Sequence, residues 1–65
     1  MKYYLIDLER SISLGRIHYW KPNKQGYTIY IIDAGQYTQE EAKRLVMDDI
    51  DKITVCISVE KANSL

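Results

Sequence analysis

The chain has 65 residues, its nine basic and nine acidic side chains cancel, and it contains one cysteine. An intrachain disulfide is therefore excluded, and one Cys with one His falls short of the four ligands of a structural zinc site. The zero net charge disfavours non-specific binding to nucleic acid. No apolar run approaches the roughly 20 residues of a membrane-spanning helix.

The small size predicts a homo-oligomer. A domain of this length buries only about 60% of the surface that its unfolded chain exposes. Small domains often add a disulfide, a metal or an oligomer contact, and only the last remains here. A lone cysteine is typical of a reducing compartment, and the short apolar start does not match a signal peptide. We therefore expect one cytoplasmic domain over residues 1–65 that forms a dimer.

Residues 2–8 are predicted to form the first strand, because β-preferring residues alternate there, with Tyr4, Ile6 and Leu8 on one side. Residues 9–15 are predicted to be a polar connection, since serine and glycine interrupt the pattern.

Residues 16–21 and 27–32 are predicted to be the two strands of a hairpin. Pro22 presets φ, Asn23 tolerates left-handed geometry, and Gly26 supplies a positive φ where the chain re-enters the sheet.

The expected register of this hairpin places Lys21 opposite Tyr27. Trp20 and His18 then share a face with Tyr30. A slip of one residue would exchange the two faces. Because one helix can cover only one face of a sheet, we expect the aromatic face to need a partner or a ligand.

The clearest helix signal begins at Thr38, which forms a capping box with Glu41. We expect the helix to run from Gln39 to about Asp49, after Gly35 lets the chain swing out of the hairpin. The apolar residues at helical spacing should form its buried stripe. They are Ala42, Leu45, Val46 and Ile50.

Residues 52–60 are predicted to be the last strand, followed by a frayed tail. Its core face should carry Ile53, Val55, Ile57 and Val59, with Cys56 on the opposite face. The predicted order is β-β-β-α-β. The expected fold is α+β, an antiparallel or mixed sheet with one helix packed on one face.

The hairpin carries the candidate binding residues. Tyrosine and tryptophan recur at binding hot spots, and polar residues at the turn would add directional contacts. These side chains could recognise a partner or form a dimer interface, and the sequence leaves both readings open. The candidates are His18, Tyr19, Trp20, Lys21, Asn23, Lys24, Tyr27 and Tyr30.

Other chemistry-bearing residues favour structural roles. His18 could act as a general base, but no nucleophile motif accompanies it. Asp48, Asp49 and Asp51 form an acidic corner whose spacing does not match a calcium loop. The glycines do not form a phosphate-binding motif. We therefore expect no cofactor, no metal and no enzymatic activity.

Three segments resemble a family of very small proteins encoded by tailed bacteriophages. They are residues 19–23 (Tyr-Trp-Lys-Pro-Asn), 26–28 (Gly-Tyr-Thr) and 34–42 (Ala-Gly-Gln-Tyr-Thr-Gln-Glu-Glu-Ala). The family pattern is W-[KR]-P-N-x-x-G-Y-T, a short strand, then A-G-x-[YF]-[TS]-x-E-E-A. Residues 29–32 are more apolar than this pattern. The resemblance implies a phage gene product that acts in the bacterial cytoplasm, where such accessory proteins counter host defences by binding.

The leading hypothesis is a homodimer that inhibits a host antiviral defence protein stoichiometrically. The second is a sponge for a nucleotide signal, in which the aromatic rings stack a base while Arg16, Lys21 or Lys24 meets the phosphates. A third is a nucleic-acid-binding module, in which exposed rings stack single-stranded bases, although the neutral charge disfavours it.

Overall fold

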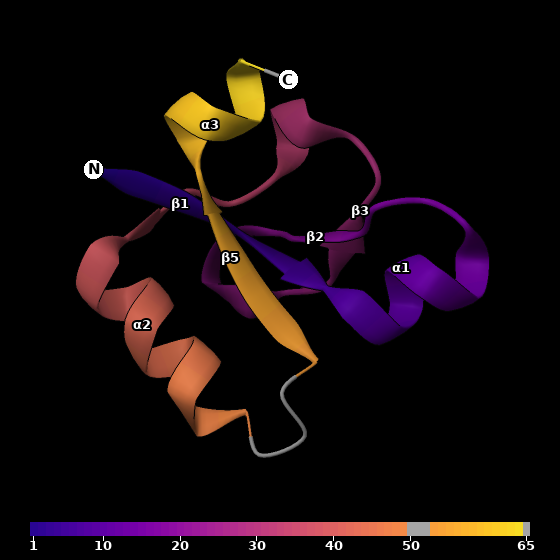
Figure 1. The fold of residues 1–65 in the computed structure, drawn as a ribbon, viewed down its shortest axis with the longest axis horizontal. Helices are drawn as coiled ribbons and strands as arrows, with labels where there is room; N and C mark the ends of the chain where they lie inside the picture. The colour runs from indigo at the N-terminus through magenta and orange to yellow at the C-terminus, as the bar shows by residue number, and fades with distance from the viewer. Residues whose placement is uncertain (50–52, 65) are drawn as a thin grey trace.

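The sheet is organised around strand β1 (Lys2–Asp7), which is paired along both of its edges. The computed structural model describes residues 1–49 and 53–64. Strand β5 (Thr54–Ser58) pairs antiparallel with one edge of β1 along almost its whole length (Figure 1). The other edge is shared by β2 (Tyr19–Trp20) and β4 (Tyr37–Thr38).

Strand β3 (Tyr27–Thr28) extends the sheet beyond β2. The predicted α+β class with an antiparallel sheet and a packed helix is confirmed. The number of elements is larger than predicted, because the described residues also contain β4, two additional short helices and two 3₁₀ turns.

The predicted central helix is confirmed as α2 (Gln39–Asp48). Thr38 Oγ1 accepts from the Glu41 backbone N at 3.1 Å, and Glu41 Oε1 accepts from the Thr38 N at 3.0 Å. These two hydrogen bonds complete the capping box that the sequence predicts. Ile50, the last residue of the predicted stripe, lies outside the described residues.

The predicted polar connection after the first strand is wrong, because the chain forms helix α1 (Leu8–Leu14) there. Asp7 is its N-cap, and the Asp7 carboxylate accepts from the Arg10 backbone N at 2.9 Å. The helix ends at Gly15, whose φ of 72° is readily accessible only to glycine. The N-cap and the C-terminal glycine therefore outweigh the helix-weakening serines between them.

The predicted frayed tail is also wrong. The last strand ends at Ser58, and the chain continues as helix α3 (Val59–Asn63). Ser58 Oγ accepts from the Lys61 backbone N at 3.2 Å, so a serine cap stops the strand before the predicted end at Glu60.

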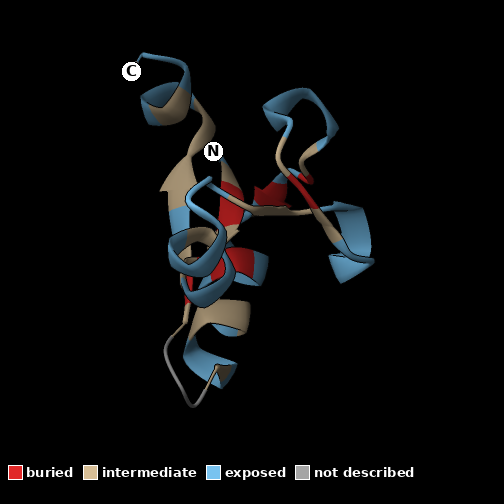
Figure 2. Cartoon of the chain, turned by 90° about the vertical axis from the view of Figure 1, so that its right-hand side faces the viewer, coloured by how far each residue is buried: buried red, intermediate tan, exposed pale blue. Residues whose placement is uncertain are grey.

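The core lies between β1 and α2. Leu5 is fully buried, and it packs with Tyr37 and Ala42, both at most 5% exposed. Leu45 and Trp20 pack against this cluster. Buried residues gather where β1 meets its neighbours, whereas the outer turns are exposed (Figure 2).

The face of strand β5 that lies on the α2 side is not the predicted one. Cys56 lies opposite Leu5 and therefore on the α2 side, while Val55 and Ile57 lie opposite Ile6 and Tyr4, away from α2. The space beneath α2 is filled by leucine and by the Trp20 and Tyr37 rings. The small side chain of Cys56 lies on this side of the sheet, and the branched aliphatic residues Val55 and Ile57 lie on the other face beside Ile6 and Tyr4.

The hairpin register differs from the predicted one by one residue. Trp20 pairs with Tyr27 and Tyr19 pairs with Thr28, and the Lys21 backbone N donates to the Gly26 carbonyl at 2.8 Å. The hairpin end is closed by the 3₁₀ turn η1 (Pro22–Lys24). The two hairpin strands are also shorter than predicted.

Gly35 joins the hairpin to the segment that leads into α2. Its backbone N donates to the Trp20 carbonyl at 2.9 Å. A Cβ at this position would lie 2.8 Å from both Cα and N of Pro22, closer than non-bonded atoms approach. Glycine is therefore required here because two backbone segments approach closely. The predicted reason, a change of chain direction after the hairpin, is not the one that the structure shows.

Two residues further on, the Tyr37 hydroxyl donates to the Lys21 carbonyl and accepts from the Lys24 backbone N. Together with Gly35, this side chain links the hairpin to residues 34–42 in space.

The Gly35→Ala variant should lose about 2 kcal/mol or more of unfolding free energy, because the new methyl group overlaps backbone atoms that cannot move independently. Urea denaturation checks this, with the exposed neighbouring change Gln36→Ala as the control, expected within about 0.5 kcal/mol of the wild type. Equal stability of the two variants would show that the hairpin relaxes away from Gly35.

Candidate functional site

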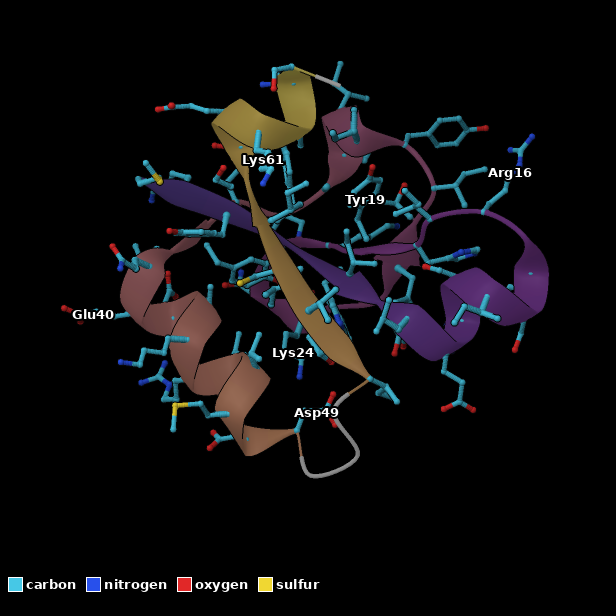
Figure 3. The ribbon with its side chains drawn as sticks, viewed as in Figure 1. Arg16, Tyr19, Lys24, Glu40, Asp49 and Lys61 are labelled. Carbon is cyan, nitrogen blue, oxygen red and sulfur yellow. The ribbon has the colours of Figure 1, made fainter. Side chains whose placement is uncertain are left out.

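The predicted aromatic face is divided between the two sides of the sheet. The observed register places Trp20 on the side covered by α2, and places Tyr19 on the other side. Figure 3 shows Lys24 on the α2 side and Tyr19 on the opposite side. The Tyr19 ring packs edge-on against Tyr4, with 5.8 Å between ring centroids. The predicted shared face of Trp20, His18 and Tyr30 is therefore wrong.

Four side chains on the α2 side form a stack in which two neighbouring rings lie between two cations. The Trp20 and Tyr27 ring centroids are 4.3 Å apart. Arg10 Cζ lies 4.1 Å from the Tyr27 centroid, and Lys24 Nζ lies 4.5 Å from the Trp20 centroid. Each cation–π contact contributes about 0.5–1 kcal/mol at an exposed site. This stack holds α1 and the turn η1 against the hairpin.

The environment of the Tyr27 hydroxyl favours its neutral form. Burial raises the pKa of Tyr27 above its usual value of 10.0, and the hydrogen bond and negative charge of Asp7 raise it further. Arg10 acts in the opposite direction and is outweighed. Asp7 is only 5% exposed, so this carboxylate both caps α1 and faces the phenol.

Trp20 has a mainly structural environment. It packs against the core cluster and, with Lys24, Leu45 and Asp48, lines a shallow hollow between the hairpin and α2. Its indole Nε1 is buried and has no hydrogen-bond partner among residues 1–49 and 53–64. The side chain is therefore part of the packing under α2 rather than an accessible recognition surface.

The hairpin turn presents polar side chains from a backbone that is held in place. Lys21 and Asn23 are exposed. Asn23 and Lys24 have φ of 59° and 55°, and Gly26 has φ of 103°, so the predicted left-handed geometry at Asn23 and Gly26 is confirmed. The Tyr37 hydroxyl bridges the two ends of the turn and reduces its freedom.

His18 is tied to its own segment. Its Nδ1 lies 2.8 Å from the Arg16 carbonyl, which can only accept, so Nδ1 carries the proton. Its backbone N donates to Ser11 Oγ at 2.8 Å. Within the described part of the chain, no three His, Cys, Asp or Glu side chains are grouped closely enough to hold a metal ion.

The predicted acidic corner contains one clear structural contact. The Asp49 carboxylate accepts from the Thr54 backbone N at 2.6 Å and so holds the first residue of β5. Asp48 lines the hollow next to Trp20. Asp51 lies outside the described residues.

One exposed apolar surface was not among the predicted site residues, apart from Tyr30. The third strand ends at Thr28, and the chain then forms the 3₁₀ turn η2 (Ile31–Asp33). The side chains of Ile32, Tyr30, Ile17 and Ile31 are 89%, 62%, 52% and 36% exposed. We call these four residues the apolar corner.

The sequence carries a signal for the apolar corner, although residues 27–32 were predicted to be a strand. Residues 29–32 are four consecutive apolar residues, whereas a half-buried strand alternates apolar and polar side chains. Ile17 lies two residues before Tyr19 and Tyr30 lies two residues after Thr28, so both flank the last pair of the hairpin ladder.

No protein-family model, curated protein or solved structure matches this chain. None of the helices in residues 1–49 and 53–64 has the length and apolar character needed to cross a membrane.

The raised pKa of Tyr27 predicts a loss of stability at high pH. The neutral phenol is favoured in the folded state, so its contribution is complete below the unfolded-state pKa of about 10 and is lost as the pH rises through the raised pKa. Above about pH 10, the unfolding free energy of the wild type should fall more steeply than that of Tyr27→Phe. Urea denaturation across this range measures both slopes. The exposed Tyr30→Phe should retain the wild-type slope, and identical slopes for all three proteins would contradict this assignment.

The environment of Trp20 predicts that Trp20→Ala lowers the unfolding free energy by about 3 kcal/mol, because it leaves a cavity beneath α2 and removes two ring contacts. Tyr30→Ala, which removes an exposed ring, should change it by about 0.5 kcal/mol or less. Thermal unfolding followed by circular dichroism compares the two. A Trp20→Ala protein as stable as the wild type would mean that this ring does not support the core.

Proposed function

We propose that the protein acts by binding another protein through the apolar corner, and that it inhibits this partner stoichiometrically. The observation that carries the proposal is the exposure of Ile32 and Tyr30, at 89% and 62%, in one short turn. Contiguous exposed apolar side chains on a small protein mark interaction surfaces.

The composition of the apolar corner suits a protein partner. Tyrosine is enriched among residues that dominate binding energy, and aliphatic neighbours exclude water around it. Arg16 precedes Ile17 and Asp33 follows Ile32 in the chain, and both are exposed. Figure 3 shows the Arg16 side chain projecting outward from the molecule. An apolar centre with a charged rim is the usual anatomy of a protein interface.

The backbone of the apolar corner is held in one conformation. The Asp33 backbone N donates to the Tyr30 carbonyl at 3.0 Å, and the Ala34 N donates to the Ile31 carbonyl at 3.1 Å. The Tyr30 backbone N donates to Thr28 Oγ1 at 3.1 Å. An ordered segment loses less conformational entropy on binding, which supports a recognition role for this turn.

The resemblance to small tailed-phage proteins supports a host antiviral defence protein in the bacterial cytoplasm as the partner. The apolar corner includes most of residues 29–32, where this chain departs from the family pattern. We propose that this segment determines which partner is bound.

A nucleotide-signal sponge has less support from the geometry. The Trp20 and Tyr27 rings contact each other, and Lys24 and Arg10 lie over them. A base could stack on these rings only if a cation moved away. Tyr30 is exposed, but among the described residues no second ring packs against it.

The proposal is tested with Ile32→Glu, which places a charge in the centre of the apolar corner. Tagged wild-type protein is used to isolate a partner from bacterial lysate, and binding of the purified partner is then measured by calorimetry. We expect one partner per binding site and a Kd raised at least about tenfold by Ile32→Glu, equivalent to about 1.4 kcal/mol.

Met47→Glu is the matched control, because Met47 is 72% exposed on α2, away from the apolar corner. This variant should bind as the wild type does. Equal binding by Ile32→Glu and the wild type would place the recognition surface elsewhere. Heat from a panel of cyclic and linear nucleotides, without a protein partner, would favour the sponge instead.

A further inference from the structure

Strand β5 has one edge without a strand partner in the described part of the chain, since its only pairing is with β1. Figure 1 shows β5 at the front of the molecule with no other element crossing it. Its five residues, Thr-Val-Cys-Ile-Ser, include no charge and no proline. Natural proteins usually protect such an edge with lysine, proline or a covering segment.

The hydrogen-bond alternation of β5 identifies the groups on this edge. The Leu8 backbone N donates to the Ile53 carbonyl at 2.6 Å, so Ile53 directs its backbone toward β1. In an antiparallel strand every second residue directs its N–H and carbonyl to the same neighbour, so Val55 and Ile57 also face β1. The backbone groups of Thr54, Cys56 and Ser58 therefore point away from β1. The bond from the Thr54 N to Asp49 Oδ2 is consistent with this alternation.

Thr54, Cys56 and Ser58 each direct one N–H and one carbonyl outward, which makes six groups. Two of these six groups already have partners in their own chain. The Thr54 N–H is held by Asp49, and the Ser58 carbonyl, at the N-cap of α3, accepts the first hydrogen bond of that helix. The remaining outward groups are the Thr54 carbonyl, the Cys56 N–H and carbonyl, and the Ser58 N–H.

These four groups are complementary to the same four groups of another copy. We propose that β5 pairs antiparallel with β5 of a second copy of this chain, about a twofold axis at Cys56. Each Cys56 N–H then donates to the Cys56 carbonyl of the other copy, and each Ser58 N–H donates to the Thr54 carbonyl of the other copy. Four hydrogen bonds form, and no hydrogen bond among residues 1–49 and 53–64 is broken.

The side chains fit the same register. Ile57 lies opposite Val55 of the second copy, on the face away from α2, so the two half-buried aliphatic pairs form one cluster. On the α2 side, Cys56 lies beside its symmetry mate and next to the shallow apolar groove lined by Val46 and Met47.

The charges at the two ends of the strand also agree with this pairing. Because Ser58 lies opposite Thr54 of the second copy, α3 approaches the end of β5 that Asp49 holds. Figure 3 shows Lys61 at the α3 end of β5 and Asp49 near the other end. Antiparallel pairing brings these opposite charges toward each other twice.

A second copy is favoured over a different protein because the leftover groups pair with themselves in this single register. The pairing also lengthens the sheet of a domain that is small enough to gain from association. The contact is limited to one strand edge, so its affinity should be at the weak end for specific interfaces. This inference does not rest on the proposed partner at the apolar corner.

The test uses Cys56→Lys, which places two like charges opposite each other at the twofold axis. Cys56 is exposed, so the fold should tolerate the change. Cys56→Ser is the control for loss of the thiol, and Gln36→Lys is the control for the added charge, because Gln36 is exposed and precedes β4, which pairs with the other edge of β1. Sedimentation velocity over a concentration series should show a dimer for the wild type and both controls, and a monomer for Cys56→Lys.

Amide hydrogen exchange gives a second, residue-specific measurement. Exchange at the Cys56 and Ser58 amides should slow as the wild-type concentration rises, whereas the Thr54 amide, held by Asp49, should not depend on concentration. Ile32→Glu should dimerise like the wild type, which separates this inference from the proposed function.

Three results would overturn the inference. The first is a wild type that stays monomeric with concentration-independent exchange at Cys56 and Ser58. The second is a dimer that persists in Cys56→Lys. The third is protection of these two amides only when a different protein is added.

Discussion

Pairing to strand β1 is the constraint on which the rest of the structure depends. β2, β4 and β5 all pair with this strand, so neither the hairpin nor the last strand has its position without it. Its middle residue, Leu5, has no exposed surface and contacts the core beneath α2. In a domain with so few buried side chains, the loss of one central strand would remove both the ladder and the core.

The hairpin and the start of α2 are joined by backbone contacts rather than by a large apolar interface. The Gly35 backbone lies against Pro22 and bonds to Trp20, and Tyr37 bridges the hairpin turn. This arrangement gives the sequence pattern of residues 19–42 a physical explanation. Its first half builds the turn, and its second half supplies the glycine, the tyrosine and the helix cap that hold the turn against the sheet.

Structural and exposed aromatic residues are separated in this protein. Trp20 and Tyr27 support the packing of α1, α2 and the hairpin, with Arg10 and Lys24 over their rings. Tyr30 extends from a short turn beside three isoleucines and carries the proposed recognition. The unpaired edge of β5 is a different kind of surface, since it offers backbone groups in a fixed order rather than side chains. The protein therefore presents a side-chain surface suited to a partner and a backbone edge suited to another copy of itself.

Interactions between residues close in the sequence were sufficient to predict several elements of the fold. The first strand, the capping box at Thr38 and the left-handed residues in the hairpin turn were predicted from sequence, because each depends on neighbours a few residues away. Helix α1 was missed because Asp7, the last residue of β1, was not recognised as the N-cap of a following helix. Of the candidate site, Tyr30 lies in the apolar corner, while Trp20, Tyr27 and Lys24 are joined in the stack.

The sequence by itself determined where the chain turns, where α2 begins and that a strand precedes both. Only the tertiary structure decided which face of each strand is covered. A shift of one residue between Trp20 and its partner exchanges the two faces, and the alternation within β5 is compatible with either orientation. Pairing with β1 made the choice, because it places Cys56 opposite the buried Leu5 on the α2 side, and Val55 and Ile57 opposite Ile6 and Tyr4 on the other face.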